Sequence, residues 1–467
     1  MDNKLKEKYV QLDKKNIWHP FTQMADWVND EPSKPLIIDK AKGAYLYDVD
    51  GKKYIDGISS LWVNLLGHRN CLIDKAIKVQ INKVSHSTFL GLTHVPAIEL
   101  SEKVLNILPK NIKKIFYSDN GSTAVEIALK MAYQYWQFKK EKRTKILSLK
   151  NAYHGDTIGA VSVGGTDLFH AKFKSLLFKS YFAMSPYCYR CNFRTKDIPF
   201  PLKVKDFKNH NLQIGCKGEC IKQVEEILSK HSKQIAAAII EPLNQAASGM
   251  IIMPKGYLSE YAKLCKKYDV LLICDEVATG FGRTGKMFAV EHENVHPDFI
   301  CLSKGITGGY LPLAITATTN KIYNTFLGKY EEFKTFFHGH SYTANPLACA
   351  AANAVVDILT KDNIFQKINI IIKHLEIELK GLLEHNRIGN IRQCGLMAGI
   401  EIIEDKTTGK SYNCRLKIGA KVCTKMREHG IIIRNLGDIL VLFLPLIITK
   451  REISKITRAI KIELDEL

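Results

Sequence analysis

The sequence has no apolar run long enough to cross a membrane, and its opening stretch MDNKLKEKYVQLDKK is charged and lacks the apolar core of a secretory signal. We therefore predict a cytoplasmic protein. A recognisable nucleic-acid-binding module is also missing, although the chain contains 67 Lys and Arg against 47 Asp and Glu residues and therefore has a net charge of +20. Because the lysines are spread over predicted amphipathic helices, we interpret the charge as solvated helix faces that help to steer anionic substrates.

Twelve cysteines without a secretion signal do not indicate a disulfide framework. Four of them form two close pairs, Cys188 with Cys191 and Cys216 with Cys220, and such pairs can hold zinc or an iron–sulfur cluster. The long gap and the unequal spacing are not typical of a zinc ribbon. We therefore expect free thiols in a surface insertion and no metal, with the metal site as the alternative.

The distribution of short apolar runs predicts an α/β fold. Such runs occur near residues 115, 146, 235, 270, 299 and 313, separated by intervals of helix length, as in a mostly parallel central sheet flanked by helices. With 467 residues the chain is long enough for two domains. We predict an N-terminal segment of a smaller α+β domain at 1–60, a large domain at 61–344, and the rest of the small domain at 345–467.

An acid and a lysine follow two of these runs. The strand predicted at 270–274 ends on Asp275, and the strand predicted at 299–302 is followed by Ser303 and Lys304. The carboxyl ends of parallel strands open onto one crevice, so both side chains are expected there. Pyridoxal phosphate requires such a pair, because a lysine holds it as a Schiff base and a carboxylate keeps its ring nitrogen protonated.

Two further stretches suit the same cofactor. Gly121 and Ser122 fall at a predicted helix N-terminus, where Thr123 and Glu126 have the spacing of a capping box and free amides attract phosphate. Tyr153 follows the strand predicted at 145–149 and either stacks on a planar cofactor or covers the core.

Three other features leave alternatives open or are rejected. The stretch Gly280–Lys286 matches G-x-x-x-x-G-K, but Met287 replaces the Ser or Thr that would bind magnesium, so we reject a P-loop nucleotidase. Arg434 either forks onto a substrate carboxylate or forms a surface ion pair. Trp62 is either a core residue or an aromatic wall of a pocket.

Three motifs together resemble a known family. DEVATGFGRTG, SKGITGG and HGHSYTANPLACA occur in the order and spacing of the class III, fold-type I pyridoxal-phosphate aminotransferases, and the resemblance covers nearly the whole chain. It implies a fold-type I transferase that acts as a homodimer. It also implies the following roles: Lys304 as Schiff-base lysine, Asp275 as pyridinium partner, Tyr153 on the ring face, Gly121 and Ser122 on the phosphate, and His340 and Ser341 reaching the phosphate from the second subunit.

The heptad WHPFTQM, beginning at Trp18, narrows the resemblance. It is similar to the signature of the family branch that transfers an amino group from S-adenosylmethionine to 8-amino-7-oxononanoate in biotin biosynthesis. In that branch Arg434 would bind the substrate carboxylate, while Phe21, Trp62 and Gly339 would line the pocket.

Some residues in these regions depart from the branch. This chain has Phe21 for a common Tyr, Leu61 before Trp62 for a second Trp, and His340–Ser341 for Pro–Thr. These departures leave lysine as an alternative amino donor in the same reaction. The other alternative is a class III ω-aminotransferase acting on ornithine, diaminobutyrate or β-alanine, against which the heptad argues.

Overall fold

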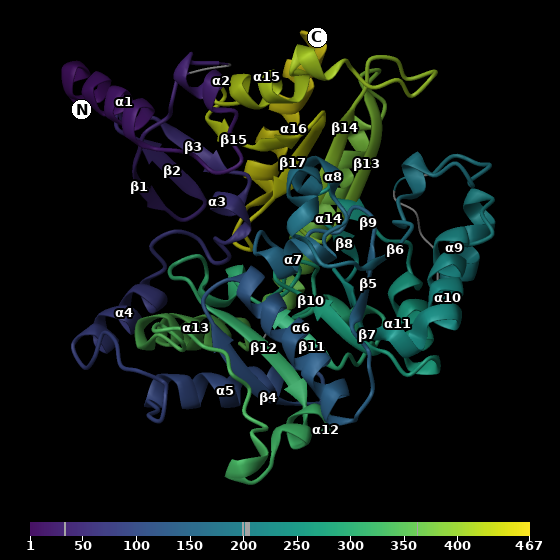
Figure 1. Ribbon diagram of the computed structural model, residues 1–467. Helices are drawn as coiled ribbons and strands as arrows, with labels where there is room; N and C mark the ends of the chain where they lie inside the picture. The colour runs from purple at the N-terminus through teal and green to yellow at the C-terminus, as the bar shows by residue number, and fades with distance from the viewer. Residues whose placement is uncertain (32–33, 199, 201–205, 362) are drawn as a thin grey trace.

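A seven-stranded sheet forms the centre of the computed structural model, which describes residues 1–31, 34–198, 200, 206–361 and 363–467 (Figure 1). The strand order is β4-β12-β11-β10-β7-β5-β6. The bounds are β4 (Ile112–Ser118), β5 (Lys145–Leu149), β6 (Tyr181–Ala183), β7 (Ile235–Ile240), β10 (Leu271–Asp275), β11 (Phe299–Leu302) and β12 (Ala314–Thr319). The predicted α/β class with a mostly parallel sheet is confirmed.

The central strands β7, β10 and β11 are largely apolar and buried on both sides because helices cover both faces of the sheet. Residues of β7 and β10 are buried along their whole length. On one face Ile239 and Ile273 pack with α6 (Gly121–Phe138), and on the other Ile240 and Cys274 join the larger core. The remaining helices of this region are α4 (Cys71–Ile81), α5 (Val95–Ile107), α7 (Ile158–Val163), α8 (Asp167–His170), α9 (Phe207–Ile214), α10 (Glu219–His231), α11 (Tyr257–Lys267), α12 (Asn320–Tyr323) and α13 (Pro346–Leu359).

Strand β12 runs against its neighbours. It pairs antiparallel with β11 on one side and with β4 on the other, whereas the other described pairings of the sheet are parallel. The link from β11 to β12 holds only the short helix η5 (Lys304–Thr307) and a turn. So short a connection cannot make the crossover that a parallel pair requires.

Two smaller sheets lie together with both chain ends in the upper part of Figure 1. One has the order β1-β2-β3-β15, in which the C-terminal β15 (Ile431–Ile432) pairs in parallel with β3 (Lys53–Asp56). In the same sheet β2 (Tyr45–Asp48) pairs antiparallel with β3, and the hairpin between them turns at Asp50–Gly51. The other elements are β1 (Ile38–Lys42), β13 (Ile388–Cys394), β14 (Met397–Ile402), β16 (Arg434–Leu436), β17 (Ile439–Phe443), α14 (Ile364–Leu382), α15 (Ile418–Lys425) and α16 (Lys450–Asp465), with the hairpin β8 (Asn244–Gln245) and β9 (Ile251–Ile252) beneath them.

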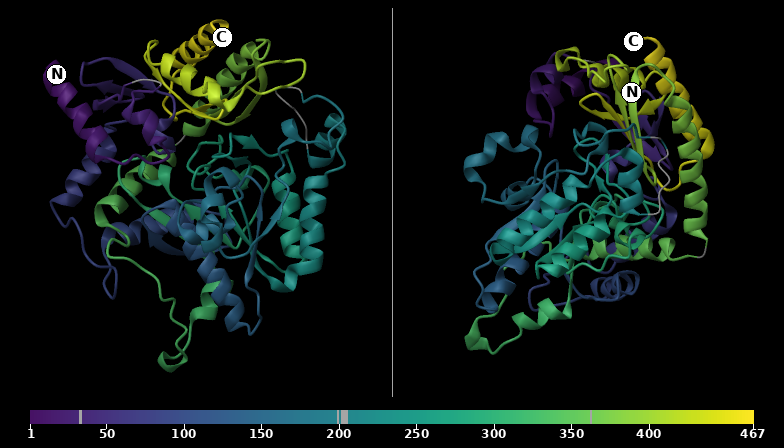
Figure 2. Two further views of the ribbon diagram at one scale, coloured as in Figure 1. Left: turned by 45° about the horizontal axis from the view of Figure 1, so that its top comes forward. Right: turned by 90° about the vertical axis from the view of Figure 1, so that its right-hand side faces the viewer.

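Figure 2 shows these small sheets covering one end of the central sheet, with α14 and α16 on their outer side. At the N-terminus, α1 (Asn3–Asn16) and α2 (Met24–Val28) flank an irregular segment. In the single chain the side chains of this segment are open to solvent, since Trp18 is 88% exposed and Phe21 60% exposed. Among the helices the structure describes, none combines the length and the apolar character needed to cross a bilayer.

Candidate active site

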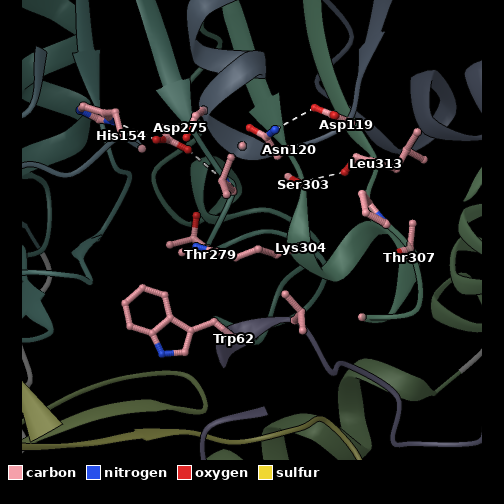
Figure 3. Close-up of a pocket in the computed structure, with 18 of the residues that line it drawn as sticks. Trp62, Asp119, Asn120, His154, Asp275, Thr279, Ser303, Lys304, Thr307 and Leu313 are labelled. Atoms are coloured by element: carbon pink, nitrogen blue, oxygen red, sulfur yellow. Dashed lines mark hydrogen bonds and ion pairs between the residues drawn. The ribbon is translucent and has the colours of Figure 1, made fainter. Parts of the chain in front are cut away.

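A cavity of about 400 Å³ opens beyond the carboxyl ends of β10 and β11, where the small sheets meet the central one (Figure 3). Six predicted site residues line it: Trp62, Gly121, Ser122, Tyr153, Asp275 and Lys304. Five others are not among its lining residues: Phe21, Gly339, His340, Ser341 and Arg434. The strand ends therefore bring the acid and the lysine to one crevice, as their positions predicted.

Lys304 reaches into this cavity from the end of β11. Its backbone has φ +49°, and η5 begins with it. The ammonium nitrogen lies 4.8 Å from the centre of the Trp62 ring (Figure 3). Burial lowers the pKa of Lys304 below its ordinary value of 10.5, and the negative charges of Asp275 and Glu241 oppose part of that shift. A lowered pKa increases the neutral, nucleophilic fraction of the amine.

Asp275 is buried and fixed by two donors. His154 approaches Oδ2 with Nδ1 at 2.8 Å, and the amide of Val277 donates to Oδ1 at 3.1 Å. Since an ionised carboxylate only accepts, Nδ1 of His154 carries the proton. The other ring nitrogen, Nε2, is buried and has no hydrogen-bond partner among the described residues. Sequence reasoning missed His154, although it stands beside Tyr153 in the stretch NAYHGD.

The neighbouring Glu276 has a different role. It turns away from the cavity and accepts bonds from the hydroxyl of Thr279 at 2.6 Å and from the amides of Ala289 and Val290. Burial raises the pKa of Glu276 to about 7, and those three bonds oppose the shift. Of the two adjacent acids in DEVATG, Asp275 therefore lines the cavity, whereas Glu276 holds the loop that follows.

Glu241 is a second cavity residue that sequence reasoning did not assign. It directly follows β7, is 6% exposed, and accepts bonds from the amides of Tyr153 at 3.0 Å and Ala246 at 3.1 Å. Burial raises the pKa of Glu241 to about 7, the charge of His154 opposes that shift, and Asp275 adds to it. The signal in the sequence was present, because an apolar strand ends on this acid.

The N-terminus of α6 forms another wall of the cavity. The helix is capped by Asn120, whose side-chain oxygen accepts from the Thr123 amide at 3.0 Å, and the Thr123 hydroxyl takes the reciprocal bond at 3.3 Å. The prediction of a capping box formed by Thr123 and Glu126 is thus wrong, because the box is formed one turn earlier, by Asn120 and Thr123. Glu126 instead accepts from the amide of Gly159 at 2.7 Å. The first amides of this 18-residue helix have no partner within the helix, and Gly121 and Ser122 line the cavity, an arrangement that favours a bound anion.

Close backbone packing holds this wall in place. The hydroxyl of Ser122 accepts from the Asp156 amide at 3.1 Å. A Cβ on Gly155 would lie 1.9 Å from the same hydroxyl, and a Cβ on Gly121 would lie 2.6 Å from a methyl of Val277. Both positions therefore require glycine.

Tyr153 and Trp62 are the two aromatic residues predicted for the site that line the cavity. The Tyr153 hydroxyl donates to Asp156 at 2.7 Å, and burial together with that carboxylate raises the pKa of the phenol above its usual 10. Trp62 is 6% exposed and stacks on Phe443 at 5.0 Å with 13° between the rings. Both alternatives considered for Trp62 therefore hold, because the residue is buried in the core and also forms a wall of the cavity.

An aromatic chain extends from Tyr153 toward the N-terminal segment. The ring of Phe169 lies 6.2 Å from Tyr153, and Phe21 lies 5.7 Å from Phe169, both edge to face. Arg434 begins β16, where burial lowers its pKa. No ion pair to Arg434 occurs among the described residues, so the surface ion pair considered from the sequence is not found there.

The loop before α13 carries the remaining predicted residues. Gly339 and Ser341 are exposed, and the His340 amide donates to Thr343 at 3.2 Å. The Nε2 atom of His340 is buried and lacks a partner among the described residues. This loop does not reach the cavity of its own chain.

The two cysteine pairs converge beside α9 and α10. Cys188, Cys191, Cys216 and Cys220 line one small cavity, and Cys188 Sγ lies 3.4 Å from Nε2 of His210. All twelve cysteines of the chain are free thiols. Within the described part of the chain, no group of three or more His, Cys, Asp or Glu side chains is arranged to hold a metal ion.

Comparisons with known proteins identify the family of the chain. The profile of the family described as aminotransferase class-III matches residues 28–464. The chain is 47% identical to the adenosylmethionine-8-amino-7-oxononanoate aminotransferase of Methanocaldococcus jannaschii, over 97% of this chain and 96% of that protein. The crystal structure of an enzyme of that name and organism superposes with a TM-score of 0.90 at 43% identity, covering 99% of both chains. An amine transaminase from an uncultivated Pseudomonas species, solved with PLP bound, gives a TM-score of 0.87 at 32% identity over 97% of this chain and 98% of that one.

The chain therefore belongs to the class III aminotransferase family, and its fold-type I architecture follows from the same comparisons.

Proposed function

We propose that this protein is a pyridoxal-phosphate-dependent aminotransferase that moves an amino group from S-adenosylmethionine to 8-amino-7-oxononanoate. The product would be 7,8-diaminononanoate, an intermediate of biotin biosynthesis. One observation carries the proposal: Lys304, Asp275 and the N-terminus of α6 meet in one cavity. The alignment over nearly the full chain with proteins named for that reaction supports the choice of substrates.

The residues of the cavity fit pyridoxal 5′-phosphate. The amine of Lys304 suits its aldehyde, the carboxylate of Asp275 suits its protonated ring nitrogen, and the amides of Gly121 and Ser122 suit its phosphate. The glycines at this wall leave space that a Cβ would fill. Tyr153 supplies an aromatic face beside the same space.

The chain's own residues would divide the chemistry as follows. When bound, the cofactor supplies an electron sink for cleavage of a bond at the donor carbon. Lys304 Nζ holds the cofactor in the resting enzyme and, when free, accepts the proton from the donor carbon and returns it. Asp275 stabilises the positive charge at the ring nitrogen, and His154 keeps that carboxylate oriented through its Nδ1–H.

The substrates would lie between the two small-sheet segments and the cavity. We propose that Arg434 binds the carboxylate of the oxononanoate, because its guanidinium has no carboxylate partner among the described residues and carries a fork of donors. Trp62 and Phe21 would flank the apolar chain of the substrate. Phe169 connects Phe21 to the cavity wall at Tyr153.

We propose that the enzyme is a homodimer in which each subunit completes the other's cavity. Gly339, His340 and Ser341 stand on a loop that does not line the cavity of its own chain, and His340 Nε2 has no partner among the described residues. Placed on a partner, this loop would bring His340 and Ser341 to the phosphate and Gly339 to the substrate. Mass measurement in solution at dilute and concentrated protein tests the dimer.

Two further assignments belong to the same proposal. We place the enzyme in the cytoplasm, as for a biosynthetic aminotransferase. We divide the chain into a small domain formed by 1–60 and 345–467 and a large domain at 61–344, which is supported by the parallel pairing of β15 with β3.

A donor panel tests the function. Purified enzyme with 8-amino-7-oxononanoate is offered S-adenosylmethionine, lysine, ornithine, diaminobutyrate or β-alanine, and diaminononanoate is measured by mass spectrometry. We expect product with S-adenosylmethionine and parallel double-reciprocal lines, as in a two-step exchange. If product forms with lysine and with none of the other amines, lysine rather than S-adenosylmethionine is the amino donor. Transfer among the other amines without use of the oxononanoate would assign the chain to the ω-aminotransferases instead.

A further inference from the structure

The wall of the cavity that carries Trp62 has an unusual backbone. Ser59, Ser60, Leu61 and Trp62 all have positive φ angles, of 49°, 46°, 66° and 73°. None of them is glycine, although the left-handed region is unfavourable for residues with a Cβ. Such a run persists only where the surrounding structure holds it, and it occurs most often at functional sites. We call Ser59–Trp62 the left-handed turn.

One side of the left-handed turn is held by Asp56. This buried carboxylate accepts from the Ser60 amide at 2.9 Å and from the Ser60 hydroxyl at 2.7 Å. His68 Nε2 lies 3.0 Å from the same carboxylate. Burial alone would raise the pKa of Asp56, but the bonds from His68 and Ser60 lower it, so the carboxylate stays ionised as an acceptor for the turn.

The other side is held by Arg283, which comes from the loop after β10. Its Nη1 donates to the Ser59 hydroxyl at 3.1 Å and to the Leu444 carbonyl at 2.6 Å. Its Nη2 donates to the carbonyls of Trp62 at 3.3 Å and Asn64 at 3.1 Å. The guanidinium therefore connects the first and last residues of the left-handed turn to Leu444, the residue that follows β17.

The environment of Arg283 is unusual for a charged side chain. It is 1% exposed, and no acidic side chain in the described part of the chain forms an ion pair with it. The guanidinium lies 4.7 Å from the centre of the Phe443 ring, on which Trp62 stacks. A buried cation satisfied by carbonyls and a ring is costly to maintain, which indicates that these contacts serve a purpose.

We propose that Arg283 is a positioning residue that acts through Trp62. By fixing both ends of the left-handed turn and the ring beneath the indole, it holds Trp62 against Lys304 and shapes the side of the cavity that receives the apolar chain of the acceptor. The assignment of the acceptor rests on the proposed function; the positioning of Trp62 does not. Loss of Arg283 would release the indole from the wall while the central sheet stays folded.

The test follows the solvent accessibility of each tryptophan by oxidative footprinting and mass spectrometry on the holoenzyme. The chain provides its own standards, because Trp18 is 88% exposed and Trp136 is 3% exposed in a separate core cluster. In Arg283→Lys we expect the oxidation rate of Trp62 to rise several-fold while the rates of Trp18 and Trp136 stay unchanged.

Arg143→Lys is the matched control. Arg143 is also 1% exposed, and its guanidinium lies 3.5 Å from the centre of the Trp136 ring. This variant should leave the oxidation of Trp62 as in the wild type, with any change confined to Trp136. If Arg283→Lys does not fold, Ser59→Ala removes one acceptor of the guanidinium and should raise the oxidation of Trp62 in the same direction.

Kinetics supply the second measurement. In Arg283→Lys we expect the KM for the acceptor to rise on the order of tenfold, with a smaller change in kcat, because binding along the wall is lost and Lys304 is retained. A Trp62 that stays as protected as in the wild type, in folded Arg283→Lys or Ser59→Ala, would overturn the inference. If the donor panel excludes the oxononanoate, the footprinting still decides whether Arg283 positions Trp62.

Discussion

The imidazole of His154 donates from Nδ1 to Oδ2 of Asp275 across 2.8 Å, and both side chains are buried at the wall of the cavity. The histidine follows β5 and the acid ends β10, so two strands of the central sheet contribute to one pair. In our proposal this pair controls the charge opposite the cofactor ring, because the donor orients the carboxylate that faces it.

The His154 bond predicts a catalytic loss without unfolding. His154→Phe removes the donor and leaves the carboxylate of Asp275 with the Val277 amide alone, so we expect kcat to fall on the order of 100-fold. His154→Asn retains a donor and should lose less. Far-ultraviolet circular dichroism verifies the fold, and equal kcat in the wild type and His154→Phe would contradict the role.

Lys304 predicts how cofactor uptake depends on pH. Because burial lowers the pKa of this amine, its neutral form dominates above a midpoint that lies below 10.5. The rate at which apoenzyme forms its covalent cofactor link should therefore rise with pH and level off below that value, as measured by absorbance after mixing.

Lys304→Ala should fold and show no such link, whereas the exposed Lys263→Ala should behave as the wild type. Full transaminase activity in Lys304→Ala would remove this residue from the proposed role.

Gly155 predicts a steric limit at the phosphate wall. Its φ is +118°, and the added Cβ of Gly155→Ala would meet the Ser122 hydroxyl at 1.9 Å. We expect a destabilisation of about 1–3 kcal/mol from the strained backbone, together with weaker binding of the cofactor. Thermal unfolding with and without cofactor measures both effects.

Gly381→Ala is the control for that substitution, because nothing lies within 4 Å of its Cβ and the residue is inside α14. There we expect unchanged or slightly higher stability, since alanine favours a helix. A Gly155→Ala protein as stable as the wild type would contradict the packing argument.

His210 predicts an acid-sensitive part of the fold next to Cys188. Burial lowers its pKa to about 4, whereas the imidazole in the unfolded chain titrates near 6.5. Between these values the unfolded state binds the extra proton, so the contribution of the neutral imidazole is present above pH 6.5 and is lost as pH falls toward 4.

Melting temperatures measured from pH 7.5 to 4.5 test that sign. The wild type should lose more stability on acidification than His210→Gln, and the two curves should run together above pH 6.5. Parallel curves over the whole range would exclude a buried neutral His210.

The sequence by itself determined six of the seven strands of the central sheet, the order of the motifs and the residues at strand ends. Short apolar runs were sufficient to predict β5 and β11 at their observed bounds, because strands covered on both faces must be apolar throughout. The same periodicity placed Asp275 and Lys304 at one edge of the sheet. Family motifs then supplied the chemistry that local patterns leave open.

Only the tertiary structure decided which distant residues meet. The partnership of His154 with Asp275, and the closure of Arg283 around the left-handed turn, join segments that share no local pattern, so spacing could not reveal them. The reversed direction of β12 and the cap at Asn120 depended on a short connection and on competition between nearby side chains. The local sequence determines which backbone conformations have low free energy, whereas tertiary packing supplies the contacts that stabilise the strained ones.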